Sequence, residues 1–447
     1  MREYEVVVIG GGPGGYQAAL ELGKAGVKTL LIERCKERVG GTCLNLGCIP
    51  TKNYLHTASF ISKIPYFEQM GLSLDYKGLN LVQLKEKTTA LITEIRTGVL
   101  WMLEQSKVEL FYGSASFVDA NRVDVDGEII AFEKCIIATG SHVRELPQLP
   151  IDSSSIISSD DVFKLSAIPK SIAIIGTGPI GCEFATFFSA LGVDVTLIGR
   201  STQLLPSEDE DVSKALLRVF KKSNINVLTS STIEKVKVNK DEVELFLNDT
   251  QESIKCELVL SATGRIPNTD GVKLENSGVK KDERGFIEVS PSFQTSQEHI
   301  YAVGDCIDTP AYAHTAYAEA KIVAKNIVSN ESKTNTHITP STIFTNPQIA
   351  SCGLKEREAN QNGIEIEVKK AFFKVNSKAK INGDDSGFAK LVVCAKSGVI
   401  LGAVIIGVEA TEIIHEIVLC VEKKITMNEL RAVIHAHPTV SEIITYL

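Results

Sequence analysis

The chain has 447 residues, of which 44% are hydrophobic and 23% charged, with 47 Lys and Arg against 55 Asp and Glu. At roughly 150 residues per domain, this length predicts about three domains with apolar side chains enough for a core in each. The net charge of −8 excludes a dedicated binder of nucleic acid or anionic membranes, which would need a basic face. No apolar run reaches the roughly 18 residues of a membrane span. Because no basic leader precedes the first strand, we expect an unexported, cytoplasmic protein.

The first predicted elements form a strand, a glycine-rich loop, a helix and a second strand. The apolar run 6–9 precedes the loop, and a helical stretch over 16–25 and a strand over 28–32 follow it. The glycines with the GxGxxG spacing are Gly10, Gly12 and Gly15. Such a loop makes a tight turn, lets the backbone approach a pyrophosphate and packs the helix on the strand, while the helix N-terminus binds the anion. Glu33, at the end of the second strand, is placed to bind the hydroxyls of an adenosine ribose.

The same unit recurs in the middle of the chain, with strands over 171–175 and 193–198 and a helix over 182–191. Its glycines are Gly176, Gly178 and Gly181. One isolated match is weak evidence, but two complete units predict two dinucleotide sites. The position equivalent to Glu33 is Gly199, followed by Arg200. A carboxylate there would favour NAD, whereas its loss beside an arginine can accommodate the 2′-phosphate of NADP.

Two further apolar strands run into glycine turns, within 134–140 and 257–265, and each closes one nucleotide-binding unit. The leucine and isoleucine spacing over 91–103 predicts a helix, and we expect Trp101 on it to lie in the core.

The last part of the chain differs from the rest, because no third glycine fingerprint follows residue 340. Alternating strands are predicted over 389–394 and 399–406, followed by a helix over 412–422, which indicates a separate α+β domain. The polar stretch 329–339 is the best candidate for a linker.

Ten cysteines are too few for a disulfide scaffold, and eight of them are isolated in the sequence. We expect these eight to be buried apolar fillers: Cys35, Cys135, Cys182, Cys256, Cys306, Cys352, Cys394 and Cys420. Only Cys43 and Cys48 are close, and such a pair is more often catalytic or metal-binding than structural. Their spacing fits one helical turn and a strained, easily reduced disulfide. A zinc site would need more soft ligands nearby, and a structural disulfide is disfavoured in a reducing compartment.

The segment 40–52, Gly-Gly-Thr-Cys-Leu-Asn-Leu-Gly-Cys-Ile-Pro-Thr-Lys, resembles the redox-active disulfide motif of the flavin-dependent pyridine nucleotide:disulfide oxidoreductases. The motif has a leucine after Cys43, and in this it most resembles the members of the family that oxidise dihydrolipoyl groups. The segment 302–305 resembles the second flavin motif of this family, and Ala313-His314 follows it. The segment 435–442 resembles the family's His–Glu signature, so the resemblance spans essentially the whole chain.

The resemblance implies roles for two pairs of residues. Cys43 would be the interchange thiol that reacts with substrate, and Cys48 the thiolate that lies against the flavin. Lys52 and Glu183 would form a buried pair near the reactive nitrogen of the flavin. A thiolate is needed because the neutral thiol is nearly inert as a nucleophile.

In the C-terminal signature, the resemblance implies that His437 is the acid–base and that Glu442 orients its imidazole. His437 is favoured over His435 by the proline that follows it and by the carboxylate five residues later. In this family the His–Glu pair reaches the disulfide of the other subunit, which implies a homodimer. The chain stops five residues after Glu442, where family members usually continue.

The resemblance also implies two sets of cofactor contacts and no metal. The expected FAD contacts are Gly10, Gly12, Gly15, Glu33, Thr42, Lys52, Gly140, Asp305 and Ala313. The expected NAD(P) contacts are Gly176, Gly178, Gly181, Arg200 and Gly264. NAD is favoured because only one basic residue stands after the second unit, where a 2′-phosphate site would offer a second cation.

The expected fold is α/β, with two Rossmann-like nucleotide-binding domains for FAD and NAD(P) and a C-terminal α+β dimerisation domain. The expected divisions are 1–146 for the FAD domain with the disulfide, 147–267 for the NAD(P) domain, 268–338 for a central region and 339–447 for the interface domain. The implied activity is oxidation of protein-bound dihydrolipoyl groups, with electrons passing to NAD, in a 2-oxo acid dehydrogenase or glycine cleavage complex. The alternatives are an NADPH-dependent disulfide reductase of the glutathione reductase kind and a flavin-bearing docking subunit.

Overall fold

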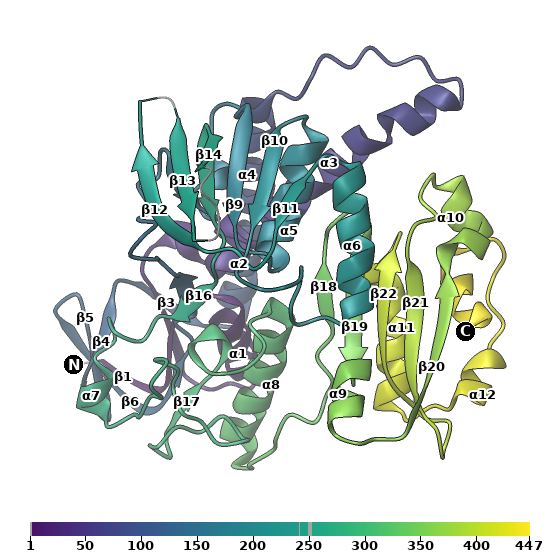
Figure 1. The fold of residues 1–447 in the computed structure, drawn as a ribbon. Helices are drawn as coiled ribbons and strands as arrows, with labels where there is room; N and C mark the ends of the chain where they lie inside the picture. Colours follow the sequence, from purple (N-terminus) through teal and green to yellow (C-terminus); the bar gives the residue numbers. More distant parts are fainter. Residues whose placement is uncertain (1, 241, 249–252) are drawn as a thin grey trace. The chain divides into compact units, whose positions relative to one another are not determined.

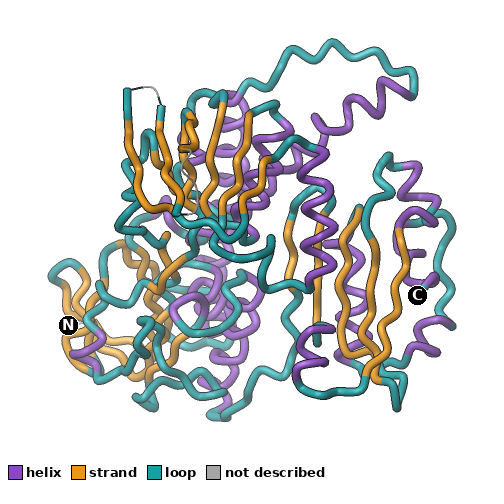
Figure 2. The backbone as a smooth tube through the Cα atoms, in the orientation of Figure 1, coloured by secondary structure: helices purple, strands orange, loops and turns teal. Residues whose placement is uncertain are grey.

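The computed structural model describes residues 2–240, 242–248 and 253–447 (Figure 1). The chain divides into two units, each assembled from segments that are distant in the sequence. The first unit contains 1–51, 85–144 and 264–336, and the second contains 52–84, 145–263 and 337–447. Both helices and strands are present in each unit, and Figure 2 colours them purple and orange. The mixed α/β class expected from the sequence is confirmed.

The first unit is built on a seven-stranded sheet with the order β3-β2-β1-β6-β5-β4, in which β17 also pairs with β6. Its strands are β1 (Arg2–Ile9), β2 (Thr29–Glu33), β3 (Glu109–Tyr112), β4 (Ala115–Asp119), β5 (Arg122–Val125), β6 (Glu128–Ile137) and β17 (Ile300–Ala302). The strands β3, β2, β1, β6 and β17 are parallel to one another, and β4 and β5 are antiparallel. A separate antiparallel pair joins β7 (Ser141–Val143) to β16 (Arg265–Pro267).

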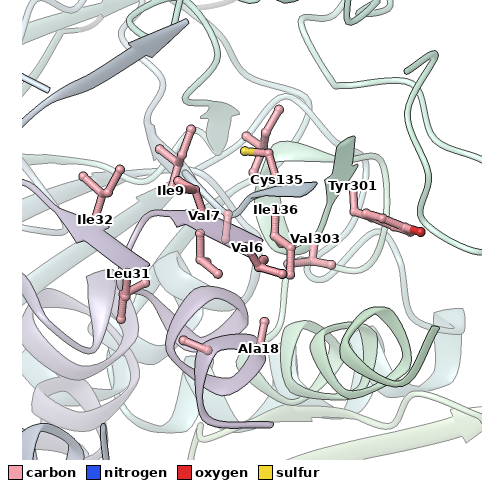
Figure 3. Packing of buried hydrophobic residues seen from close by; sticks show 14 of the residues in the cluster. Val6, Val7, Ile9, Ala18, Leu31, Ile32, Cys135, Ile136, Tyr301 and Val303 are labelled. Atoms are coloured by element: carbon pink, nitrogen blue, oxygen red, sulfur yellow. The ribbon is translucent and has the colours of Figure 1, made fainter. Parts of the chain in front are cut away.

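The helices of the first unit cover this sheet. They are α1 (Pro13–Lys24), η1 (Lys36–Arg38), α2 (Gly41–Leu46), α7 (Leu274–Ser277), η3 (Gly304–Cys306), α8 (Ala313–Ser329) and most of α4 (Leu81–Gln105). The core lies between the sheet and α1 and α8, and side chains from β1, β2, β6 and α1 meet there (Figure 3). Parallel strands buried on both faces need continuous apolar runs, which explains Val6-Val7-Val8-Ile9.

The second unit contains a five-stranded parallel sheet with the order β11-β10-β9-β15-β8. Its strands are β8 (Ile156–Ser158), β9 (Ser171–Ile175), β10 (Asp194–Ile198), β11 (Asn226–Leu228) and β15 (Leu258–Ser261). An antiparallel sheet of three strands contains β12 (Ile233–Val238), β13 (Val243–Leu247) and β14 (Ser253–Cys256). The helices of this part are η2 (Val162–Lys164), α5 (Pro179–Ala190), α6 (Glu210–Lys222) and α3 (Cys48–Gln69), which begins in the first unit.

The C-terminal part of the second unit has an antiparallel sheet with the order β18-β19-β22-β21-β20. Its strands are β18 (Ser341–Ile343), β19 (Gln348–Gly353), β20 (Ile366–Phe372), β21 (Phe388–Cys394) and β22 (Ile400–Gly407). Its helices are α9 (Glu356–Gln361), η4 (Phe373–Val375), α10 (Ser377–Ile381), α11 (Ala410–Glu422), α12 (Met427–Arg431) and η5 (Val440–Tyr446). The helix α11 packs against β19 and β22. This part is the α+β structure that the sequence predicts.

A buried lysine joins three elements of the second unit. Lys390 on β21 is 1% exposed, and its Nζ lies 2.9 Å from a carboxylate oxygen of Asp209, of Asp211 and of Glu356. These three carboxylates stand before α6, on α6 and on α9. No sequence motif marks this cluster, because its members lie up to 181 residues apart.

Two expectations about burial were wrong in part. The helix predicted over 91–103 is part of α4, but Trp101 is 60% exposed and does not belong to the core. Val99 and Leu103 on the same helix are buried. Trp101 lies two positions from each of them and therefore faces the opposite side of the helix. Six of the eight isolated cysteines are buried, whereas Cys35 and Cys394 are partly exposed.

The polar stretch after α8 contains neither helix nor strand, as a linker would. Among the described residues, no helix is both long and apolar enough to cross a bilayer.

Candidate active site

The first glycine loop connects β1 to α1 and needs glycine for steric reasons. Gly10 has φ +105°, and a Cβ there would lie 2.3 Å from the carbonyl oxygen of Ala138. A Cβ at Gly15 would lie 1.7 Å from the carbonyl oxygen of Gly10, so helix and turn are in direct contact. Among the described residues, no side chain caps the N-terminus of α1 and no acidic residue stands in its first turn. Its N–H groups can therefore bind a pyrophosphate, for which this geometry is suited.

Glu33 stands at the end of β2 beside this loop. Its Oε2 accepts a hydrogen bond from the backbone N–H of Gly11 at 2.8 Å, and its Oε1 accepts one from the N–H of Arg34 at 2.6 Å. Burial raises the pKa of Glu33, and these two hydrogen bonds only partly offset the effect. The structure thus places the carboxylate next to the loop, where a ribose of a bound dinucleotide would lie.

Asp305, on η3, belongs to a hydrogen-bonded network that the sequence analysis did not find. The hydroxyl of Ser141 donates to Oδ2 of Asp305 at 2.7 Å. Arg265 donates from Nε to Oγ of Ser141 and from Nη2 to its carbonyl oxygen, both at 2.9 Å. The sequence does hint at Ser141 and Arg265, because they directly follow Gly140 and Gly264, the glycines that end the two apolar strands.

The start of η3 is held by a buried acid. Glu319 on α8 is 1% exposed and accepts the backbone N–H of Gly304 at 2.7 Å. Burial raises the pKa of Glu319. The helix α8 begins at Ala313, as expected for the segment after the second flavin motif, and the ring of His314 stacks on that of Tyr312 at 5.1 Å.

The two close cysteines lie on consecutive helices, which differs from the single helical turn that their spacing predicts. Cys43 is on α2, the chain changes direction at Gly47, and Cys48 is the first residue of α3. Cys43 is partly exposed and Cys48 is exposed. Thr42, the residue before Cys43, lies in the first turn of α2.

The cysteine segment is held against the first glycine loop by backbone contacts. The N–H of Gly40 donates to the carbonyl oxygen of Gly11 at 2.8 Å. A Cβ at Gly41 would lie 2.6 Å from Cα of Gly12, so the two backbones touch. The beginning of α2 and the beginning of α1 are therefore packed together, which places the start of the cysteine segment beside the first glycine loop.

Two tyrosines near the cysteines were also missed. The hydroxyls of Tyr16 on α1 and Tyr317 on α8 lie 2.6 Å apart, and their rings meet edge to face at 5.8 Å. Burial raises the pKa of both tyrosines, and negative charge on Cys43 raises both further. Cys48 acts in the same direction on Tyr317. The two tyrosine hydroxyls are thus close enough to the thiols to interact with them electrostatically.

Lys52 and Glu183 meet in the second unit. The Nζ of Lys52 lies 2.9 Å from both carboxylate oxygens of Glu183, whose side chain is 6% exposed. The backbone N–H of Phe344 donates to Oε1 of Glu183 at 2.9 Å, and Nζ of Lys52 lies 4.7 Å from the centre of the Phe344 ring. The structure brings together the pair that the resemblance implies, and Phe344 is an additional partner.

His437 and Glu442, also in the second unit, form a hydrogen-bonded pair. Nδ1 of His437 lies 2.9 Å from Oε1 of Glu442, and the N–H of Thr439 donates to Oε2 at 2.7 Å. The hydrogen bond from Thr439, followed by that from His437, lowers the pKa of Glu442. The imidazole is 69% exposed, and the contact at Nδ1 leaves Nε2 for proton transfer.

His435 has a different environment from its neighbour. Its side chain is only 7% exposed, with Nε2 at 3.0 Å from Glu416 and Nδ1 at 3.2 Å from the carbonyl oxygen of Val433. Both ring nitrogens therefore have partners, as in a structural histidine.

The second glycine loop connects β9 to α5 and repeats the geometry of the first. Gly176 has φ +126°, and a Cβ there would lie 2.2 Å from the carbonyl oxygen of Ala262. A Cβ at Gly181 would lie 1.8 Å from the carbonyl oxygen of Gly176, while a Cβ at Gly178 would meet open space. Arg200 is exposed after β10. The strand β15 and the turn at Gly264 follow as expected.

These features define a class of proteins: oxidoreductases with two dinucleotide-binding α/β folds and a cysteine pair beside one of them. Residues 4–320 match the family described as pyridine nucleotide-disulphide oxidoreductase, and residues 339–447 match the dimerisation domain of the same description. The chain therefore belongs to the pyridine nucleotide-disulfide oxidoreductase family. Membership implies FAD and NAD as cofactors, and the first loop, Glu33 and Asp305 fit a bound FAD.

Similar proteins cover almost the whole chain. It is 36% identical over 445 residues to a dihydrolipoyl dehydrogenase of Chlamydia pneumoniae, covering 99% of this chain and 95% of the relative. It is 35% identical over 447 residues to a dihydrolipoyl dehydrogenase of Geobacillus stearothermophilus, covering 99% and 94%. The structure is similar to that of the HOCl-induced flavoprotein disulfide reductase RclA from Escherichia coli, with a TM-score of 0.90, 25% identity and coverage of 99% and 98%.

Proposed function

We propose that the chain catalyses the dihydrolipoyl dehydrogenase reaction, in which a protein-bound dihydrolipoyl group is oxidised and NAD is reduced. The observation that carries this proposal is the attachment of the Cys43–Cys48 segment to the first glycine loop through Gly40 and Gly11. A redox cysteine pair at this place can exchange electrons with a flavin bound on the loop. The curated relatives at 35–36% identity favour this function over a glutathione reductase-like one.

The proposed exchange balances as two thiol–disulfide steps. A substrate thiolate attacks Sγ of Cys43, the Cys43–Cys48 bond breaks, and Cys48 leaves as a thiolate. The second substrate thiol attacks the substrate sulfur of the mixed disulfide and releases Cys43. The substrate dithiol becomes a disulfide and the cysteine pair becomes a dithiol, so two electrons and two protons pass from the substrate to the cysteines and no net proton is released. FAD, when bound, supplies the two-electron acceptor that exchanges a hydride with the nicotinamide.

His437 accepts the proton of the attacking substrate thiol in this proposal, and Glu442 orients the ring. Lys52 and Glu183 provide a fixed, charged pair at the flavin. We also propose a homodimer, because residues 339–447 match the dimerisation domain of this family. Val433 and Ile434, next to the His–Glu pair, are 51% and 96% exposed and support a covering subunit.

The proposed domains are 1–146 for the FAD domain with the disulfide, 147–267 for the NAD(P) domain, 268–338 for the central region and 339–447 for the interface domain. A cytoplasmic location fits a cysteine pair that cycles between thiol and disulfide. A 2-oxo acid dehydrogenase or glycine cleavage complex would supply the lipoyl-bearing partner.

The function is tested by an anaerobic titration of the FAD-loaded protein, followed by visible absorbance. Dihydrolipoamide is expected to produce a long-wavelength charge-transfer band, because a thiolate then lies against the flavin. NADH should reduce lipoamide in the steady state. Absence of the band together with absence of lipoamide reduction by NADH would refute the proposed function.

Replacing His437 by glutamine is expected to lower the rate of dihydrolipoamide oxidation by about 10²–10⁴-fold, because a positioned acid–base contributes that much. His435→Gln is the matched control, since it removes a histidine two positions away that has its own partner Glu416. We expect the control to retain the rate within a few-fold. The assignment fails if both variants lose activity equally while keeping their flavin. Steady-state kinetics with saturating NAD measure both.

A further inference from the structure

The two glycine loops of this chain differ at one pair of positions. The second residue of the loop is Gly11 in the first unit and Thr177 in the second. The residue at the end of the following strand is Glu33 in the first unit and Gly199 in the second. The small and the large residue have therefore exchanged places between the two loops.

The swap of small and large residues has a steric cause. A Cβ at Gly11 would lie 3.0 Å from Oε2 of Glu33 and 3.2 Å from its Cβ and Cγ. A Cβ at Gly199 would lie 2.4 Å from Cγ2 and 2.6 Å from Oγ1 of Thr177. In each unit one side chain fills the space between loop and strand end, but it comes from the strand in the first unit and from the loop in the second.

Neither residue of the second pair can easily move away. The N–H of Gly199 donates to the carbonyl oxygen of Leu228, and its carbonyl oxygen accepts the N–H of Ser231, both at 2.9 Å. The carbonyl oxygen of Thr177 accepts the N–H of Leu205 at 2.9 Å. Thr177 is 5% exposed. A side chain added at position 199 would therefore collide with the buried side chain of Thr177, while hydrogen bonds hold the backbone of both residues.

A carboxylate at the strand end binds the ribose hydroxyls of NAD and excludes the 2′-phosphate of NADP by charge. We propose that Thr177 sets the nucleotide selectivity of the second site: it occupies the place of that carboxylate, so the site takes NADPH as well as NADH. This inference rests on the proposed function for the identity of the electron acceptor. It makes Thr177 and Gly199 a coupled pair, because an acid at 199 can act only after Thr177 is removed.

The test measures binding of NAD⁺ and NADP⁺ to the FAD-loaded protein by isothermal titration calorimetry at one salt concentration. In the unaltered protein we expect the two dissociation constants to agree within about tenfold. In the double variant Thr177→Gly/Gly199→Glu, NADP⁺ should weaken relative to NAD⁺ by about 100-fold or more, since facing like charges is costly. Gly199→Glu alone should weaken both nucleotides, because the loop is displaced. Thr177→Ser, which keeps Oγ, should leave the ratio unchanged within a few-fold.

A preference of the unaltered protein for NAD⁺ above about 100-fold would overturn the inference. So would an unchanged ratio in a double variant that retains its flavin absorbance. If the double variant does not fold, a second pair of variants decides the steric part. Gly199→Ala should lower the melting temperature of the protein that has Thr177. In the Thr177→Gly background, the same substitution should not lower it. Equal losses in both backgrounds would contradict the coupling.

The binding measurement contains no thiol substrate, so it separates this inference from the proposed function. If both nucleotides bind as expected and dihydrolipoamide is not oxidised, the function is wrong and the role of Thr177 stands. If dihydrolipoamide is oxidised and NADP⁺ does not bind, the function stands and the role of Thr177 is wrong.

Discussion

Cys43→Ser and Cys48→Ser are each expected to lower the oxidation of dihydrolipoamide by NAD by about 10⁴-fold or more. A serine hydroxyl is not ionised near neutral pH and forms no disulfide, so neither step of the exchange can proceed. The loss should occur without unfolding, because Cys43 is partly exposed, Cys48 is exposed, and the segment is fixed by the backbone at Gly40 and Gly41.

The two variants should differ in their spectra, which distinguishes their roles. Cys43→Ser leaves the Cys48 thiol intact, so we expect a long-wavelength band at alkaline pH without any substrate. Cys48→Ser should lack that band at every pH. Cys394→Ser is the control, because Cys394 is also partly exposed and lies outside the motif. Intact activity in Cys43→Ser would instead support the docking-subunit alternative.

The second large effect is expected for the buried lysine of the second unit. Lys390→Ala should lower the free energy of unfolding by about 3–5 kcal/mol, because it leaves three carboxylates without their shared cation. The carboxylates of Asp209, Asp211 and Glu356 each lie 2.9 Å from Nζ in a site where the lysine is 1% exposed. Urea unfolding followed by circular dichroism, at fixed protein and FAD concentration, measures the change.

Lys214→Ala is the matched control, because Lys214 forms an ion pair with Glu210 on the same helix, α6. That pair is exposed, at 60% and 70%, and exposed pairs contribute only about 0–1 kcal/mol. A loss in Lys390→Ala no larger than in Lys214→Ala would show that the buried cluster does not stabilise the fold.

The same cluster makes stability depend on pH at both extremes. Burial alone would raise the pKa of Asp211, but hydrogen bonds from Lys370 and Lys390 outweigh it and lower the pKa. Burial alone would lower the pKa of Lys390, but its three carboxylate partners raise it. The contribution of Asp211 is therefore present above about pH 4 and is lost as the pH falls through the lowered value.

The contribution of Lys390 is present below about pH 10 and is lost as the pH rises through its raised pKa. The free energy of unfolding of the unaltered protein should show a plateau between these two pH limits and should fall outside them. In Lys390→Met, which keeps most of the side-chain volume, the part of this fall that the cluster causes should be absent. Identical pH profiles of the two proteins would contradict the linkage.

Local pattern was sufficient for most of the architecture. The apolar runs before each glycine loop are the central strands β1 and β9, and the loops lead directly into α1 and α5. These elements follow from neighbouring residues alone, because a tight turn needs glycine and a parallel strand buried on both faces needs an apolar run. The resemblance then identified pairs that the structure brings together, Lys52 with Glu183 and His437 with Glu442.

Contacts between distant segments could not be obtained in this way. Ser141 meets Asp305 across 164 residues, Tyr16 meets Tyr317 across 301, and Lys390 meets Asp209 across 181. Of these residues only Asp305 stands in a motif, and the partner of each residue depends on which strands and helices pack side by side.

The sequence by itself determined the two nucleotide-binding units, the cysteine pair and the α+β end of the chain, because each depends on short-range spacing. Only the tertiary structure decided that Trp101 faces solvent, that Cys43 and Cys48 stand on two helices, and that Thr177 fills the space beside Gly199. The physical reason is that the exposure of a side chain and its steric contacts depend on which other element packs against it. A spacing rule describes one element at a time and contains no information about what occupies the space next to it.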